Sequence, residues 1–166
     1  ATNDGAPPHA EDDDLVAGGP PRPATLSPRQ DDDIERTFVT VARFAPGSKE
    51  VIGRWEDELL AGLEVYEDPW LCTGGLLLGL ATGADSAVFD PRPLLTPGLA
   101  AHPYDLAALV VARAAGVIVE ALPPGPLAVP LDNASPVAWA GYANQAIAAR
   151  LRPRPATSAP GRAGSG

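Results

Sequence analysis

One aspartate of this sequence stands out as a residue that could do chemistry. Asp105 lies in the stretch His-Pro-Tyr-Asp-Leu-Ala-Ala, residues 102–108, where a loop ends and a predicted helix begins. Its carboxylate suits two roles there. It can cap the helix through backbone N–H groups, or it can serve as a hard oxygen ligand for Mg²⁺ where a phosphate also approaches. Asp85 and Asp90 lie at the two ends of the preceding predicted strand. Each could project into the same region as Asp105 or simply occupy a strand-end or turn position.

Other residue types do not form a site. Cys72 is the only cysteine and His102 is one of two histidines, which excludes a disulfide framework and disfavours a cysteine-rich or histidine-based metal centre. The glycines of residues 74–79 do not follow a predicted strand, so a dinucleotide-binding fingerprint has no support. Twelve basic and 21 acidic residues give a net charge of −9, which argues against nucleic acid as a partner. No apolar run is long enough to predict a membrane span.

Composition predicts one ordered domain between two tails. Residues 1–34 are rich in Pro, Gly and acidic residues and predict a disordered linker. The acidic runs at 11–14 and 31–33 lack the spaced ligands of a calcium loop, so a solvated chain is favoured over a metal site. Residues 35–152 form the predicted domain, and residues 153–166 a disordered tail.

Two further expectations concern the origin and location of the chain. It contains no methionine, even at its first position, which we interpret as the mark of a processed product or a fragment. It has no secretory signal at its start and no pair of cysteines, so the expected location is the cytoplasm.

Within the predicted domain, the hydrophobic pattern alternates between strand and helix. Ser48 and Asn144 are expected to cap helices at their start, and Gly83 to end one. The predicted order is a strand at 37–42, helices at 48–63 and 74–82, a strand at 86–90, a helix at 103–115, strands at 117–119 and 137–140, and a helix at 144–151. This order is typical of an α/β domain with helices layered on a sheet.

The order of these motifs resembles the inositol monophosphatase family. Residues 79–90 resemble the family's segment valine-alanine-x-glycine-x-x-aspartate-alanine, which leads to an acidic residue at the end of a strand. Residues 102–108 resemble its tryptophan-aspartate-x-alanine-alanine motif. Pro126-Leu127 and the helix at Asn144 fall where the family has a Gly-x-Pro-Leu turn and a terminal helix. The resemblance covers residues 36–152 and only the C-terminal half of the family's layered α-β sandwich.

The resemblance implies a Mg²⁺-dependent phosphomonoesterase that hydrolyses a small phosphorylated polyol, sugar or nucleotide with a metal-activated water. By the same resemblance, Asp105 is a metal ligand, Asp90 contacts substrate hydroxyls, and Thr73 is a polar neighbour in the substrate site. None of the three is assigned a general acid or base role. The implied partners are a missing N-terminal half of the same fold and, as in relatives, a second copy in a homodimer.

The sequence also departs from the family. Leu71-Cys72 stands where the family has glycine-serine, and Tyr104 replaces the tryptophan. Residues 1–35 contain neither the family's glutamate helix nor its aspartate-proline-isoleucine-aspartate-glycine-threonine loop, so the chain alone is expected to be a poor catalyst. Two alternatives stay open. One is a non-catalytic relative that acts as a binding or scaffold module, and the other is an unrelated α/β domain in which Asp105 only caps a helix.

Overall fold

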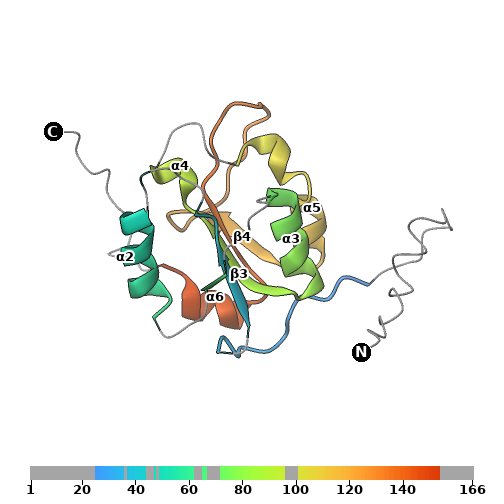
Figure 1. Cartoon of the computed structure of the whole chain (residues 1–166). Helices are drawn as coiled ribbons and strands as arrows, with labels where there is room; N and C mark the ends of the chain where they lie inside the picture. The colour runs from blue at the N-terminus through green and yellow to red at the C-terminus, as the bar shows by residue number, and fades with distance from the viewer. Residues whose placement is uncertain are drawn as a thin grey trace, which may run out of the picture.

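The computed structural model describes residues 25–35, 37–43, 47, 49–61, 65–66, 72–95 and 101–153 (Figure 1). Its strands are β1 (Phe38–Val41), β2 (Val65–Tyr66), β3 (Asp85–Asp90), β4 (Ile118–Ala121) and β5 (Trp139–Tyr142). Its helices are α2 (Lys49–Leu59), α3 (Thr73–Thr82), α4 (Arg92–Leu95), α5 (Leu109–Ala114), α6 (Gln145–Leu151) and the 3-10 helix η1 (Pro103–Leu106). None of these helices has the length and apolar character needed to cross a membrane.

The strands form one mixed sheet in the order β2-β1-β3-β5-β4. Strand β1 is parallel to β2 and β3, whereas β5 is antiparallel to both β3 and β4. The central strand β3 is buried over its last five residues, 86–90, because it has a neighbour on each side and helices on both faces. The predicted α/β architecture is confirmed.

Helices cover both faces of the sheet because the strands direct apolar side chains to both faces. Val39, Val41 and Phe89 point to one face, where they pack in the core with residues of α2 and α6. Val88 and Trp139 point to the other face and pack with α3 and α5. Figure 1 shows this arrangement, with α2 and α6 on one side of the sheet and α3 and α5 on the other.

Helix α3 ends where the sequence predicts. Gly83 follows it with a φ of 81°, the left-handed conformation that glycine adopts without strain. Only this glycine and Ala84 separate α3 from β3, so the helix and the strand run in opposite directions. The start of α3 therefore lies at the same end of the domain as the last residue of β3.

The predicted helix at 103–115 is instead two short helices, η1 and α5. The carboxylate of Asp105 accepts the backbone N–H of His102, and the Asp105 N–H donates to the His102 carbonyl oxygen at 2.9 Å. These contacts tighten the first turn into a 3-10 helix, which is common at helix starts. The chain then restarts as an α-helix at Leu109.

The sequence patterns missed two short elements, β2 and α4. Strand β2 has only two residues, and α4 is a single turn that begins at Arg92 between two prolines. The strands predicted at 117–119 and 137–140 are found at 118–121 and 139–142. Ser48, expected to cap α2, lies outside the described residues, as do residues 1–24 and 154–166.

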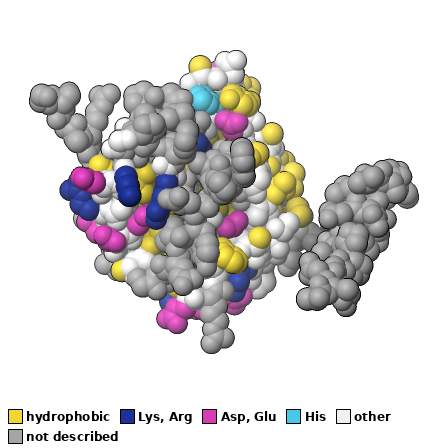
Figure 2. All heavy atoms as spheres, viewed as in Figure 1, with side chains coloured by type: hydrophobic (Ala, Val, Ile, Leu, Met, Phe, Trp, Pro, Cys, Tyr) yellow, Lys and Arg dark blue, Asp and Glu magenta, His cyan; other side chains and the backbone are white. Residues whose placement is uncertain are grey.

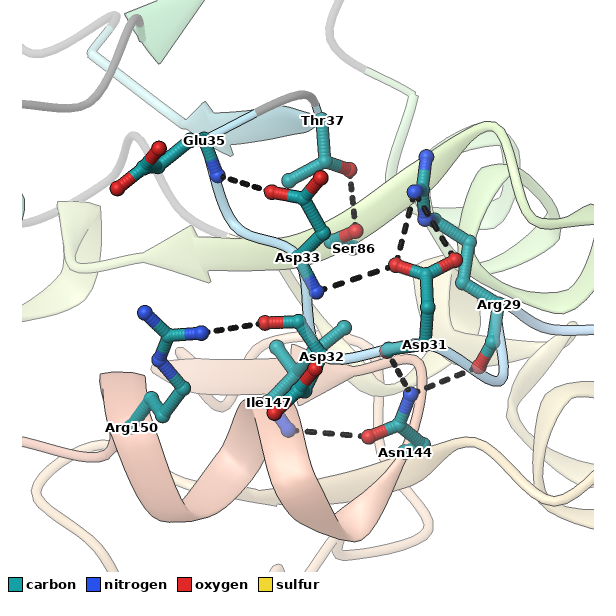
Figure 3. A network of polar contacts seen from close by, with 10 residues as sticks. All are labelled: Arg29, Asp31, Asp32, Asp33, Glu35, Thr37, Ser86, Asn144, Ile147 and Arg150. Carbon is teal, nitrogen blue, oxygen red and sulfur yellow. Dashed lines mark hydrogen bonds and ion pairs between the residues drawn. The ribbon is translucent and has the colours of Figure 1, made fainter.

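The segment at residues 25–34 lies against the domain, although its composition predicts part of a linker. Leu26 packs on the core of α3 and α5, Ile34 packs on the opposite core, and Pro28 is buried. The side-chain amide of Asn144 donates to the carbonyl oxygens of Arg29 and Asp31, at 2.8 Å each (Figure 3). The structure thus places the start of the packed domain before residue 35.

The acidic run at residues 31–33 takes part in this packing. The guanidinium of Arg29 binds both oxygens of Asp31 at 2.9 and 3.0 Å, and these hydrogen bonds lower the pKa of that carboxyl. Asp31 and Asp33 also accept backbone N–H groups two residues further along, as Figure 3 shows. Hydrogen bonds within the chain thus account for two of the three carboxylates without a metal ion.

Candidate functional site

The end of the domain where β3 finishes brings together the three residues that the sequence analysis singled out. Thr73 opens α3, and Asp90 closes β3. Helix η1 packs on α3, and a Cβ added to Gly74 would lie 3.9 Å from the carbonyl oxygen of Asp105. Figure 1 shows α4 and the start of α3 at this same, upper end of the domain. Four separate elements therefore contribute to one region.

Asp105 has one oxygen engaged and one available. Its Oδ2 accepts the backbone N–H of His102 at 2.9 Å and lies 3.6 Å from the His102 Nδ1. Its Oδ1 accepts no hydrogen bond from a described residue, and the side chain is 31% exposed. The carboxylate therefore caps η1 and still offers an oxygen to a ligand.

Asp90 is engaged through both oxygens. It is fully buried, and its Oδ1 and Oδ2 accept hydrogen bonds from Nε and Nη2 of Arg92 at 2.7 and 2.6 Å. The backbone N–H of Arg92 adds a longer contact to Oδ1 at 3.3 Å. In this arrangement the carboxylate is held by an arginine and has no oxygen turned toward a substrate hydroxyl.

Arg92 is the residue of this region that the sequence analysis did not find. It follows the acidic end of a predicted strand and stands between Pro91 and Pro93, and this spacing was the only available signal. The hydrogen bonds that Arg92 donates to Asp90 raise the pKa of Arg92, and the charges of Asp90 and Asp105 act in the same direction against the effect of burial. The Asp105 carboxylate is thus within electrostatic range of this guanidinium.

Thr73 lies at the amino end of α3, where backbone N–H groups have no partner within the helix. The residue is 95% buried, and its hydroxyl makes no hydrogen bond with a described residue. Cys72 precedes it in an extended conformation, is exposed, and makes no side-chain cap bond. The helix start therefore offers polar hydrogens next to Asp105.

Asp85 is not part of this region. It begins β3, so it lies at the opposite end of the strand, where its Oδ1 accepts a hydrogen bond from the Thr40 hydroxyl at 3.1 Å. Its carboxylate also lies against Gly79, in the space that a side chain at that position would occupy. We assign Asp85 a structural role.

The described residues do not form a metal site by themselves. No three carboxylate, histidine or cysteine side chains of the described ranges come together at a point where a metal could bind. Asp105 offers one oxygen, and Asp90 is held by Arg92. Mg²⁺ bound in proteins takes octahedral coordination from carboxylates, waters and phosphates, and Asp105 would contribute one oxygen to such a set.

The fold and the location of this region define the chain as an α/β domain with polar residues at one end of its central strand. Comparison with solved structures then shows which fold this is. An inositol monophosphatase from Anabaena (Nostoc) aligns with 81% of this chain and 49% of its own, at a TM-score of 0.56 and 16% identity.

Two further structures show the same likeness. A hypothetical protein from Pyrococcus horikoshii with similarities to inositol-1 monophosphatase gives a TM-score of 0.55 at 21% identity, over 76% of this chain and 44% of its own. Inositol monophosphatase II from Staphylococcus aureus gives 0.53 at 17% identity, over 78% and 45%. No family model and no curated protein matches the sequence.

The chain therefore has the fold of part of an inositol monophosphatase, and the expected resemblance is confirmed at the level of structure. It spans less than half the length of these solved structures.

Proposed function

We propose that the chain is the C-terminal part of a Mg²⁺-dependent phosphomonoesterase that acts on a small phosphorylated polyol, sugar or nucleotide. The observation that carries the proposal is the position of Asp105. Within a fold shared with inositol monophosphatases, it offers one carboxylate oxygen beside the start of α3. A helix start with unpaired N–H groups favours a phosphate, and a carboxylate favours a metal ion.

Each residue of the region has a role in this proposal. Asp105 contributes one metal ligand, and Thr73 with the N–H groups at the start of α3 binds the phosphorylated substrate. Asp90 acts on the substrate through Arg92, which it holds. Magnesium would supply charge neutralisation and an activated water, but the described residues provide too few ligands to derive such a step.

The proposal requires a second half of the fold. The solved relatives are more than twice as long as the region that aligns with this chain, so the remaining ligands would come from an N-terminal half. We propose that this half completes the site, that the complete protein works in the cytoplasm, and that two copies form a homodimer. The 166-residue chain alone is expected to be inactive.

The test is Mg²⁺-dependent release of phosphate from a panel of phosphomonoesters by the native protein that carries this chain. Asp105→Asn should lower the rate at least about a hundredfold, because an amide is a poor substitute for a charged metal ligand. Asparagine keeps an oxygen that can accept the His102 N–H, so the variant should keep the fold. Asp57→Asn, an exposed position on α2, is the matched control and should leave the rate unchanged.

Three results would contradict the proposal. Native protein that is folded and inactive on the whole panel would favour the non-catalytic binding module. Hydrolysis that proceeds equally well in the presence of a chelator would exclude the metal. An Asp105→Asn variant with normal activity would reduce Asp105 to a helix cap.

A further inference from the structure

The guanidinium of Arg92 has donors in excess of what its partner uses. Nε and Nη2 bind the two oxygens of Asp90. The third nitrogen, Nη1, has no hydrogen-bond partner among the described residues and is not fully buried. The side chain as a whole is only 10% exposed. Arg92 therefore has fixed geometry and an unused donor.

The ion pair also changes what this position can recognise. A carboxylate at the end of β3 would accept hydrogen bonds and so select hydroxyl groups. Because Asp90 is fully buried and bound by Arg92, the pair offers only N–H groups to a ligand. An arginine fork held by a carboxylate is suited to bind anionic oxygen, since charge-assisted hydrogen bonds are stronger than neutral ones.

The location of the pair links this property to the substrate. Asp90 ends the central strand next to the start of α3, and Arg92 follows in α4 within electrostatic range of Asp105. A phosphoryl group bound by Thr73 and the N–H groups at the start of α3 would place the rest of the substrate near Arg92. This step rests on the proposed function.

We infer that Arg92 presents Nη1 to a second anionic group of the substrate. The site would therefore favour phosphomonoesters that carry a carboxylate or another phosphoryl group over those that carry only hydroxyl groups. The substrate class is narrowed from polyols in general to phosphorylated compounds with two anionic centres. Arg92 is the residue that determines this specificity, and Asp90 is the residue that positions it.

Two esters with the same carbon skeleton test this inference by direct binding to the 166-residue chain without metal. 3-Phosphoglycerate has a carboxylate where glycerol 3-phosphate has a CH₂OH group. The chain should bind 3-phosphoglycerate about tenfold more tightly, as one charge-assisted hydrogen bond allows. The Arg92 Nε–H resonance of ¹⁵N-labelled protein should shift with 3-phosphoglycerate and much less with glycerol 3-phosphate.

The variants must remove the guanidinium without leaving a buried charge. Arg92→Gln alone would leave Asp90 buried without its counter-ion, which is strongly destabilising. The double variant Asp90→Asn with Arg92→Gln replaces the ion pair by two neutral amides of similar size. It should bind the two esters with affinities within about twofold of each other. Arg54→Gln removes the same charge from the exposed side of α2 and should keep the full preference.

Equal binding of the two esters to the unaltered chain, or no binding of either, would overturn the inference. A preference that survives in the folded double variant would overturn it as well. Failure of the proposed function looks different. In that case the chain keeps an Arg92-dependent preference for 3-phosphoglycerate, while the native protein releases no phosphate from any ester.

Discussion

At the scale of single residues, two glycines allow close packing between α3 and the sheet. A Cβ added to Gly141 would lie 2.5 Å from Cδ1 of Leu80 and 3.1 Å from the ring of Trp139. A Cβ at Gly79 would collide with the carboxylate of Asp85. Both neighbours of Gly141 are buried in the core, so they have little room to move.

We therefore expect Gly141→Ala to destabilise the domain by about 1–3 kcal/mol, the usual result of overpacking a core. Urea unfolding followed by tryptophan fluorescence would measure it. Gly53→Ala is the matched control, because nothing lies within 4 Å of its added Cβ and the residue is in the middle of α2. Alanine there should stabilise the protein by up to about 1 kcal/mol. Similar effects of the two substitutions would contradict the packing at Gly141.

Asn144 connects two parts of the chain through one side chain. Its Oδ1 accepts the backbone N–H of Ile147 at 3.0 Å, which caps α6, while its Nδ2 holds the segment at residues 29–31. Asn144→Ala should lower the free energy of unfolding by about 2 kcal/mol, more than the roughly 1 kcal/mol of an ordinary cap.

Hydrogen exchange would show which part of the Asn144 contribution is lost. Backbone amides of α6 and of the segment at residues 29–32 should exchange faster in the Asn144→Ala variant than in the unaltered chain. Asn133→Ala, in an exposed loop, should change neither stability nor exchange. A variant at Asn144 that loses only the protection of α6 would show that the contacts with residues 29–31 contribute nothing.

At the scale of elements, the sequence predicted those whose signals are local. The apolar run of α3 with its glycine stop, and the asparagine before α6, lie within a few residues of the structure they specify. The break between η1 and α5 depends on a contact of the Asp105 carboxylate with the backbone, and β2 depends on a neighbouring strand. Whether such elements form depends on contacts that the local sequence pattern does not contain.

The same division applies to the candidate site. The hydrophobic pattern predicted a strand that ends at Asp90 and a helix whose first turn contains Asp105, whereas Thr73 fell one residue before the predicted helix at 74–82. The antiparallel course of α3 and β3 brings the start of α3 and the end of β3 to the same end of the domain. Arg92 escaped notice because a sequence does not show that an arginine two residues after an aspartate folds back on it. The packing of residues 25–34 was not predicted from the sequence, because their composition resembles that of a linker and the residues they contact, among them Gly83 and Asn144, lie far along the chain.

At the scale of the whole molecule, apolar side chains remain exposed on the outer helices. Leu78 of α3 and Val111 of α5 are each 42% exposed, and Val110 of α5 is 76% exposed. Figure 2 shows hydrophobic side chains gathered on the side of the molecule where Figure 1 places α3 and α5. A contiguous apolar patch of this kind often marks a surface that another protein or segment covers.

We expect the folded chain to bind a hydrophobic dye through this surface. The double substitution Val110→Ser and Val111→Ser should reduce the dye fluorescence at least about twofold without unfolding the protein, since surface positions contribute little to stability. Leu131→Ser removes a fully exposed leucine from the loop between β4 and β5 and should leave the signal unchanged. A monomeric, folded chain that binds no dye would count against the proposed second half.

The contacts of residues 25–34 determine where the chain can be shortened without destabilising the domain. The carbonyl oxygen of Ser27 lies so close to Gly83 that a Cβ there would be 2.9 Å away, so the segment crosses the turn between α3 and β3. A chain cut to begin at Glu35 would uncover that turn, empty the places of Leu26 and Pro28, and leave the amide of Asn144 without its acceptors. Any excised version of this fold should therefore retain residues 25–34, and a protease that cleaves within them should release a less stable remainder.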